Sequence, residues 1–442
     1  MISTFINAWK VADLRKKFLF TALIVLIFRI GCVIPVPFTD ITKGIVDATD
    51  ETFFGYLSMM TGEAFSMGTI FALSITPYIN SSIIIQLLTV AIPYLEKLSK
   101  EGEEGRKKIA TITRYTTIAL AVLQSTAYFI YLRSKTDPYL LVTDANGQLF
   151  TGFWAVLQGL VVVCCLTAGS TFVMWLGEQI NEKGIGNGIS IILFAGIVSR
   201  IPTMLGVMWS YIDTYGGAYW AIVPTVLVCL LVMIGFVVWM DNAERRIPVQ
   251  YAKRVVGRKM YGGQSTHIPI KVNMSGVLPV IFASSILSIP STVQMFIKGE
   301  LNSFWKTFFE MFSTSHWFYS IIYFFLILFF AYFYASIQYN PVEMANNIRK
   351  NSGMIPGLRP GKPTADYIKK ILNRITLLGA LLLSVVALFP NVVNLLTQLI
   401  GVKPMSISLG GTSLIIVVGV ALETVKQLES QMMMRHYKGF LD

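Results

Sequence analysis

The sequence predicts an all-α membrane protein that crosses the bilayer many times. Of its 442 residues, 54% are hydrophobic and 14% are charged, whereas a typical soluble domain carries about 25% charged residues. The mean hydropathy is +0.62. Apolar windows of about 20 residues, the length that spans the hydrocarbon core, are centred near residues 28, 84, 124, 164, 194, 228, 286, 328, 384 and 420. We therefore predict ten transmembrane helices.

The first apolar segment follows several basic residues, as the apolar part of a secretory signal peptide does. Here the apolar run is long, it lacks a small-residue cleavage site, and nine further segments follow it. These properties indicate an uncleaved first span.

The second predicted span starts with an unusual stretch, Ser74–Leu88 (SITPYINSSIIIQLL). Its second half is apolar, but its first half contains Pro77 and a cluster of polar side chains. The preceding segment, Phe53–Ser74, is moderately apolar but too short and too interrupted by glycine to cross the bilayer. Irregular backbone within the membrane is stable only where protein or water surrounds it. Together these stretches predict one broken span, with a short half-helix outside and a full helix after it.

The fifth, seventh and tenth spans repeat this combination of a broken start, small polar residues and branched apolar residues. The apolar residues of the four spans are Ile75, Ile79, Ile189, Leu193, Ile281 and Ile416. In any single helix, small residues for close packing and isoleucine facing lipid are the ordinary explanation. Four such helices favour a water-filled vestibule narrowed by an apolar constriction, which closes by dewetting.

The broken second and seventh spans lie five spans apart, which is typical of an inverted repeat of five plus five helices. We therefore expect two pseudo-symmetric halves, residues 1–205 and 206–442, although no repeat is visible residue by residue.

Lysine and arginine predict the orientation. With both termini in the cytoplasm, the inside segments hold 28 of the 36 basic residues and the outside loops hold 7, as the positive-inside rule requires. Two cytoplasmic loops are long: residues 241–275, which suit a hairpin around Gly262–Gly263, and residues 340–370, which suit an irregular loop. Such basic loops contact anionic lipid or dock an acidic partner or RNA phosphate; their length favours docking.

The sequence shows no catalytic or metal-binding pattern. The three histidines lie apart, His267 and His316 in two different loops and His436 in the C-terminal tail, and the four cysteines have no ligand spacing. The GIGNG stretch at Gly184–Gly188 lacks the features of a phosphate loop. We expect no enzyme activity and no cofactor. Ionisable residues are rare inside the spans, which argues against an ion-coupled relay.

Several stretches resemble the SecY family, the channel subunits of the general protein-translocation complex. They are ITPYINSSIIIQLL with EGEEGRKKIATITRY, WLGEQINEKGIGNGISII, YAKRVVGRKMYGGQSTHIPIKVNMSGVLPVIFASSI, GMIPGLRPGKPTADYI and GGTSLIIVV. The resemblance extends from about Leu14 to the last span. It implies two five-helix halves around an hourglass pore in the bacterial cytoplasmic membrane.

The resemblance also implies roles for single residues, assigned by motif position. The pore ring would consist of Ile75, Ile79, Ile189, Leu193, Ile281 and Ile416, with Leu193 in place of the usual isoleucine. A plug within about residues 53–68 would include Phe54, Leu57, Met60 and Phe65. A lateral gate between the second and seventh spans would include Asn80, Ser81, Ser284, Ser285 and Ile289.

The partners that the resemblance implies explain the two long loops. Arg254, Arg258 and Lys259 would contact the ribosome or the SecA motor ATPase, and Arg359 would serve motor docking. SecE and SecG would be companion subunits. The cargo would be signal sequences and nascent or unfolded polypeptides, with membrane helices released to lipid. Two other functions are alternatives: a secondary transporter for a small solute, which needs intramembrane charges or a compact polar pocket, and a scaffold that only docks a cytoplasmic partner.

Overall fold

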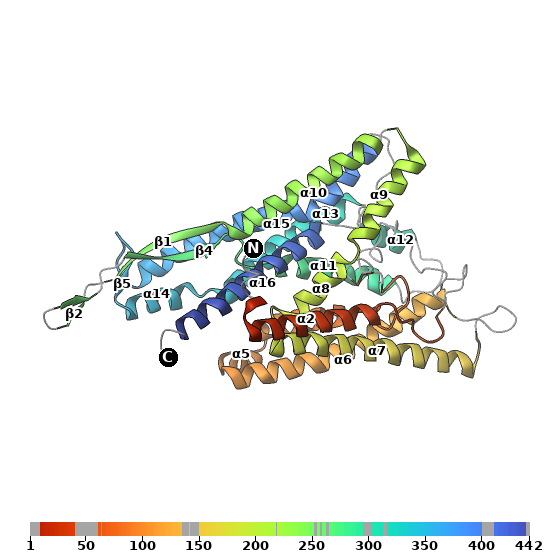
Figure 1. The fold of residues 1–442 in the computed structure, drawn as a ribbon, viewed down its shortest axis with the longest axis horizontal. Coiled ribbons are helices and arrows are strands. Elements are labelled where there is room, and N and C mark those ends of the chain that lie inside the picture. Colours follow the sequence, from red (N-terminus) through yellow and green to blue (C-terminus); the bar gives the residue numbers. More distant parts are fainter. Residues whose placement is uncertain are drawn as a thin grey trace. The chain divides into compact units, whose positions relative to one another are not determined.

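The computed structural model is mainly helical (Figure 1). It describes residues 9–39, 61–62, 64–134, 141, 150–217, 219–251, 254–256, 259–261, 265–294, 303–312, 316–399 and 411–438. The helices up to the long hairpin are α2 (Ala12–Gly31), α4 (Thr76–Ala91), α5 (Pro93–Lys100), α6 (Glu103–Ser134), α7 (Phe153–Lys183), α8 (Gly188–Val198), α9 (Ile201–Tyr215) and α10 (Tyr219–Asn242). The later helices are α11 (Leu278–Gln294), α12 (Ser303–Met311), α13 (Trp317–Gln338), α14 (Pro341–Lys350), α15 (Lys362–Leu399) and α16 (Gly411–Lys438).

Each of the ten predicted span centres falls within one of these helices. Among the described residues, seven helical stretches are long and apolar enough to cross a membrane, and the bent pair of α4 and α5 makes up to eight. Helix α11 is apolar but shorter, and the 20 residues of α2 include several basic ones in the first two turns. The prediction of an all-α multi-pass membrane protein is confirmed. The helices are consistent with ten spans, and that count stays a prediction.

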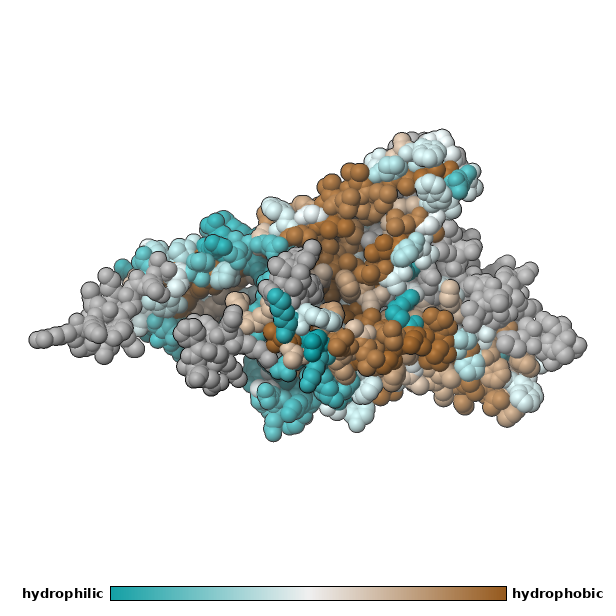
Figure 2. Space-filling view, viewed as in Figure 1, coloured by the Kyte–Doolittle hydropathy of each residue, from teal (hydrophilic) through white to brown (hydrophobic). Residues whose placement is uncertain are grey.

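Apolar and polar residues separate along the helices, as a bilayer requires. Figure 2 shows hydrophobic residues along α2 and α10, and hydrophilic residues around α5 and along β1 (Glu244–Tyr251) and β4 (Ser265–Lys271). On α10, the side chains of Leu231 and Val232 are 69% and 64% exposed. Large exposed apolar side chains of this kind are expected where lipid, rather than water, is the solvent.

The span that starts at α4 bends by 101° between α4 and α5. Ile92 is extended at this joint, with φ −106° and ψ 115°. The cause is Pro93, because proline disfavours helical backbone in the residue before it. Pro77, by contrast, lies in the first turn of α4, where proline is well accommodated. Pro77 therefore marks where the helix begins.

The chain packs as two compact units, and each is described by itself. The first contains residues 1–223, 285–319 and 390–442, and the second contains residues 224–284 and 320–389. This grouping reflects the packing of elements and does not test the expected halves, 1–205 and 206–442, which stay a prediction.

The core of the first unit lies where α6 and α7 meet the segment before α4. The buried residues of this cluster are Val36, Phe65, Ala72, Leu73, Tyr128, Leu132, Leu141, Val162 and Leu166. Helix α7 also crosses the start of α8 closely, because a Cβ at Gly188 would overlap the carbonyl oxygen of Gly177. A smaller cluster of Leu14, Ile185 and Leu428 joins α2 and α16 to the turn before α8.

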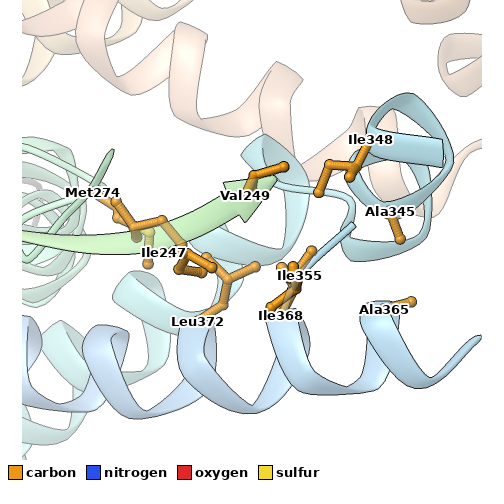
Figure 3. Packing of buried hydrophobic residues seen from close by; sticks show 10 residues of the cluster. Ile247, Val249, Met274, Ala345, Ile348, Ile355, Ala365, Ile368 and Leu372 are labelled. Carbon is orange, nitrogen blue, oxygen red and sulfur yellow. The ribbon is translucent and has the colours of Figure 1, made fainter. Parts of the chain in front are cut away.

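The second unit contains a small antiparallel sheet in the order β4-β1-β5, with β5 at Gly353–Met354. In the β1–β4 pair, Ile247 lies opposite Ile268. One face of the sheet packs on α14 and α15 (Figure 3), and the buried residues of this cluster are Ile247, Val249, Ile270, Met274, Ala345, Ile348, Ile355, Ala365, Ile368 and Leu372. The sheet and its two helices therefore have a core of their own.

Two expectations for the long loops need correction. The hairpin exists, but β2 (Arg254–Val256) and β3 (Lys259–Tyr261) pair with Val256 opposite Lys259, so the chain reverses there and not at Gly262–Gly263. The loop at 340–370 is also more regular than expected, because it contains α14. The side chain of Asn340 caps that helix by accepting from the backbone N–H groups of Val342 and Glu343, and Pro341 occupies its first turn, a common start signal.

Candidate functional site

The segment that leads into α4 is irregular and closely packed. Ser74 has a left-handed φ of 46°, which is uncommon for a residue other than glycine. The hydroxyl of Ser170 on α7 donates a hydrogen bond to the backbone carbonyl of Ser74, 3.1 Å away. Gly169, the residue before Ser170, has no room for a side chain because the carbonyl of Ile70 occupies that space. Small residues on α7 therefore admit the irregular backbone.

This arrangement positions the first two residues of the predicted ring. Ile75 is the N-cap of α4, and its side chain is 1% exposed. The backbone N–H of Ile79 donates to the carbonyl of Ile75 over 3.1 Å, so the two side chains stand one turn apart on one face of α4. Ile79 is half-buried.

The start of α8 is held in a comparable way. The side chain of Asn181 accepts from the backbone N–H of Gly188 at 2.8 Å, and Asn187 caps the helix by accepting from Ile189 N–H at 3.2 Å. These bonds satisfy backbone donors that a helix start leaves free. Ile189 is half-buried, and Leu193 is 4% exposed. The GIGNG stretch is thus a tight turn into a helix, as the sequence favoured.

Two more ring candidates lie on α16 and α11. Ile416 is the sixth residue of α16 and is 2% exposed. Ile281 is the fourth residue of α11 and is half-buried. All six ring candidates therefore lie between the N-cap and the sixth residue of their helices, α4, α8, α11 and α16.

The gate candidates differ in what they contact. Ser81 is buried, and its hydroxyl donates to the carbonyl of Thr113 on α6 at 2.8 Å, so it ties α4 to α6. Asn80 is half-buried. On α11, the Ser284 hydroxyl donates to the Ile281 carbonyl at 2.9 Å, Ser285 is half-buried, and Ile289 is 55% exposed.

Of the plug candidates, Phe54, Leu57 and Met60 lie outside the described residues. Phe65 lies inside them and is 1% exposed. Its ring packs on that of Tyr128 with centroids 4.8 Å apart, and the Tyr128 hydroxyl donates to the Phe65 carbonyl at 2.7 Å. Phe65 is therefore anchored on α6.

The candidates for partner docking belong to the two long loops, residues 241–275 and 340–370. Arg359 is exposed, and its carbonyl accepts from the Thr364 hydroxyl at 2.9 Å, which fixes the backbone just before α15. Arg254 and Lys259 belong to the paired strands β2 and β3. Arg258 lies outside the described residues.

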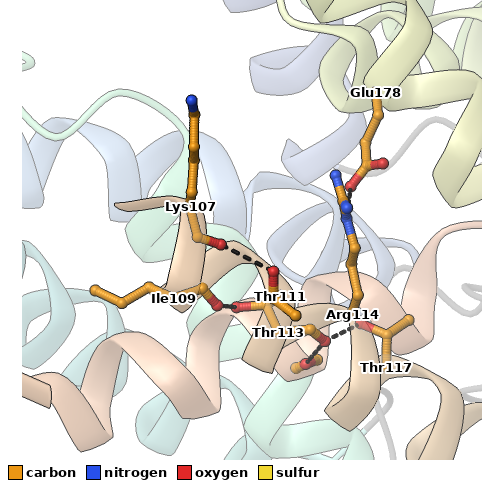
Figure 4. A network of polar contacts seen from close by, with 8 residues as sticks. Lys107, Ile109, Thr111, Thr113, Arg114, Thr117 and Glu178 are labelled. Atoms are coloured by element: carbon orange, nitrogen blue, oxygen red, sulfur yellow. Dashed lines mark hydrogen bonds and ion pairs between the residues drawn. The ribbon is translucent and has the colours of Figure 1, made fainter. Parts of the chain in front are cut away.

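A polar network that sequence reasoning missed connects α6 to α7 (Figure 4). The guanidinium of Arg114 forms a 2.7 Å ion pair with the carboxylate of Glu178. Helix α7 continues to Lys183, so Glu178 lies within the helix. The sequence signal for this longer helix is the uninterrupted helical pattern up to Gly184, where the glycine-rich turn begins.

The described residues contain no cluster of His, Cys, Asp or Glu suited to a metal ion.

Arg29 lies in the last turn of α2, close to the irregular segment before α4. A Cβ at Gly62 would lie 2.5 Å from a guanidinium nitrogen of Arg29 and 3.0 Å from the Ser199 hydroxyl. Glycine at position 62, with φ 65°, therefore lets the irregular segment approach both α2 and the end of α8.

Comparison with known proteins gives a consistent result. The family model described as SecY matches residues 69–425. The protein translocase subunit SecY of Streptomyces galbus is 46% identical, and the match covers all of both chains.

Two solved structures share the fold. One is a SecY structure, described as showing that the plug domain stabilises the closed state of the translocation channel and maintains a membrane seal; it has a TM-score of 0.61 at 18% identity, over 95% of this chain and 92% of that chain. The other is Sec61 in the canine ribosome-channel complex from the endoplasmic reticulum, with a TM-score of 0.55 at 15% identity over the same shares. The full-length match to curated relatives, together with this shared fold, shows that the chain belongs to the SecY family of protein translocase subunits.

Proposed function

We propose that this member of the SecY family forms the protein-conducting channel of the general secretory pathway in the bacterial cytoplasmic membrane, with both termini in the cytoplasm. It moves unfolded polypeptides across the bilayer and releases transmembrane segments to lipid. One observation carries the proposal: all six ring candidates lie at the N-terminal ends of four apolar helices, α4, α8, α11 and α16. Helices that begin within a membrane protein bring such residues to a central site.

In this proposal Ile75, Ile79, Ile189, Leu193, Ile281 and Ile416 form the ring. Branched apolar side chains yield around a moving polypeptide, yet they offer an ion no coordination, so the ring limits leakage. The residues at the start of α4 and of α8 support this function. Ser74 stands in a left-handed conformation before α4, and two asparagine side chains hold the start of α8. Both features fix the position of the apolar side chains along the proposed pore.

The lateral gate is proposed between α4 and α11. Asn80, Ser285 and Ile289 supply the exposed or half-buried part of its wall, while Ser81 braces α4 against α6. The plug is proposed within residues 53–68, with Phe65 as its anchored end because Tyr128 holds that residue through both its ring and its hydroxyl. The plug described for the related SecY structure supports this assignment.

Energy comes from partners in this proposal: the SecA motor, which hydrolyses ATP, or a translating ribosome. The ribosome complex described for canine Sec61 supports the second. Arg254, Arg258, Lys259 and Arg359 form the docking surface, and the buried cluster between the sheet and α15 gives it a rigid base. SecE and SecG complete the assembly. A small-solute transporter is not favoured, because the curated full-length relatives are translocase subunits.

Reconstitution tests this function. The chain is purified with SecE and SecG, placed in lipid vesicles, and supplied with SecA, ATP and an unfolded secretory precursor. Protease protection of the precursor that requires ATP is the expected result. If a complex built around the Streptomyces galbus relative protects the precursor under these conditions and this chain does not, the proposal is wrong.

A further inference from the structure

The short helix α12 gathers its aromatic side chains on one side. With 3.6 residues per turn, one arc holds Phe304, Trp305, Phe308, Phe309 and Met311, and the opposite arc holds Ser303, Lys306, Thr307 and Glu310. A helix with one apolar and one polar face needs an apolar environment on one side and water on the other.

The protein covers only one edge of this aromatic face. Phe309 is 7% exposed, whereas Phe304 is 74% and Trp305 is 48% exposed. The Trp305 ring also stacks on that of Phe309, with centroids 6.2 Å apart, which fixes its orientation. The open side of α12 therefore presents two large aromatic side chains, and a ring contact orients Trp305.

A ring contact joins the end of α12 to the start of the span α13. The rings of Phe312 and Phe318 lie against each other with centroids 6.1 Å apart, and Phe318 belongs to the first turn of the membrane span α13. That span has exposed residues at four-residue intervals, namely Trp317, Ile321, Phe325 and Phe329, and such a stripe on a span faces lipid. The C-terminal end of α12 thus lies beside the first turn of a membrane span, at the kind of position where aromatic residues concentrate in membrane proteins.

We propose that α12 is an interfacial helix that binds the lipid surface, with Phe304 and Trp305 inserted between headgroups and acyl chains. The occupant is lipid because the end of α12 contacts the first turn of the membrane span α13 through Phe312 and Phe318, and helices of this composition bind membranes through their buried apolar area.

This contact has a mechanical consequence for α11. Between Gln294 and Trp317, α12 is the one helix among the described residues. When it is bound to lipid, it tethers the far end of α11 to the membrane surface. The lipid contact depends only on the membrane spans, so it stands or falls separately from the proposed channel.

Site-specific fluorescence tests the lipid contact. Phe304→Cys, and Thr307→Cys as the matched control, are introduced into the full chain with its four cysteines replaced, labelled with an environment-sensitive dye, and reconstituted with companion subunits in phosphatidylcholine–phosphatidylglycerol vesicles. At position 304 we expect blue-shifted emission, stronger quenching by nitroxide lipids labelled near the headgroup than near the chain end, and little quenching by aqueous iodide. At position 307 we expect iodide to quench strongly.

Equal iodide quenching at both positions, without lipid quenching, would overturn the proposal. Protection of position 304 from both iodide and nitroxide lipid would also overturn it, since a protein, either a second copy or a partner, would then cover the face. If the cysteine-free chain fails to fold, the difference in tryptophan emission between the natural chain and Trp305→Phe is measured in vesicles of brominated lipid. A Trp305 contribution that brominated lipid leaves unquenched contradicts the proposal in the same way.

Discussion

The hydroxyl of Ser170 donates a hydrogen bond to the backbone carbonyl of Ser74 across 3.1 Å. Both side chains are buried, at 1% and 2% exposure, so no bulk water can replace this bond. It holds α7 to the residue whose left-handed backbone turns the chain into α4. The bond therefore fixes where Ile75 and Ile79 lie relative to α7.

Removing this bond is expected to loosen the proposed resting seal. Ser170→Ala leaves the Ser74 carbonyl buried without that donor, which costs about 1–3 kcal/mol of unfolding free energy. We expect a lower midpoint of thermal unfolding for the purified complex and a higher resting ion conductance in planar bilayers. Thr171→Ala is the matched control, because among the described residues its hydroxyl bonds to two carbonyls of its own helix. Equal effects of the two substitutions would contradict the role given to Ser170.

The crossing of α7 and α8 is expected to tolerate no side chain at its closest point. Gly188→Ala places a methyl group onto the Gly177 carbonyl, so α8 must move. Because overpacking in a tight core costs about 1–3 kcal/mol, we expect lower thermal stability and reduced translocation. Gly206→Ala on α9 is the control, since a Cβ there has no neighbour within 4 Å among the described residues. Because alanine favours a helix more than glycine does, this control should leave the free energy of unfolding unchanged or raise it by about 0.5–1 kcal/mol. A fully stable, active Gly188→Ala protein would show that the two helices can separate freely.

The proposed ring is expected to limit ion flow by its apolar character. Ile79→Asn combined with Ile281→Asn adds two amides that hold water in the constriction, so the dewetted barrier weakens. Single-channel recordings of the resting complex should then show a larger leak than the natural protein. An unchanged leak would mean that another element, such as the plug, makes the seal.

Charge reversal at Arg359 is expected to act on docking and not on folding. The side chain is exposed, so Arg359→Glu should change thermal stability by no more than about 0.5 kcal/mol. Translocation driven by SecA should fall strongly, because a repulsive charge faces the partner's acidic surface. Lys350→Glu, an equally exposed charge reversal at the end of α14, serves as the comparison. If both reversals leave SecA-driven transport intact, the docking role of Arg359 is wrong.

Much of the fold could be predicted because it depends on local composition. Long apolar windows located ten of the helices between α2 and α16, and Pro77 with its polar neighbours marked the start of α4. The cap of α14 was also present in the sequence, in Asn340 and Pro341, but its short polar helix carries no strong apolar pattern. The glycines and prolines that follow it predict an irregular loop.

Contacts between distant segments could not be predicted in the same way. The spacing of Ile75 and Ile79 gives a shared helix face, but not what that face meets. The partnership of Arg114 with Glu178 joins residues 64 positions apart, and the hydrogen bond from Ser81 to α6 gives a second function to a residue assigned to the gate by motif alone. Such pairings arise from tertiary packing, which no single segment encodes.

Site-specific crosslinking to a polypeptide in transit tests the central claim most directly. A photo-reactive amino acid is placed at Ile79, and at Ile84 on the same helix as the control, because Ile84 is exposed on another face. A secretory chain is then stalled during translocation. We predict an adduct with the stalled chain at position 79 and none, or far less, at position 84. Adducts at 84 without adducts at 79 would contradict the assignment of the pore.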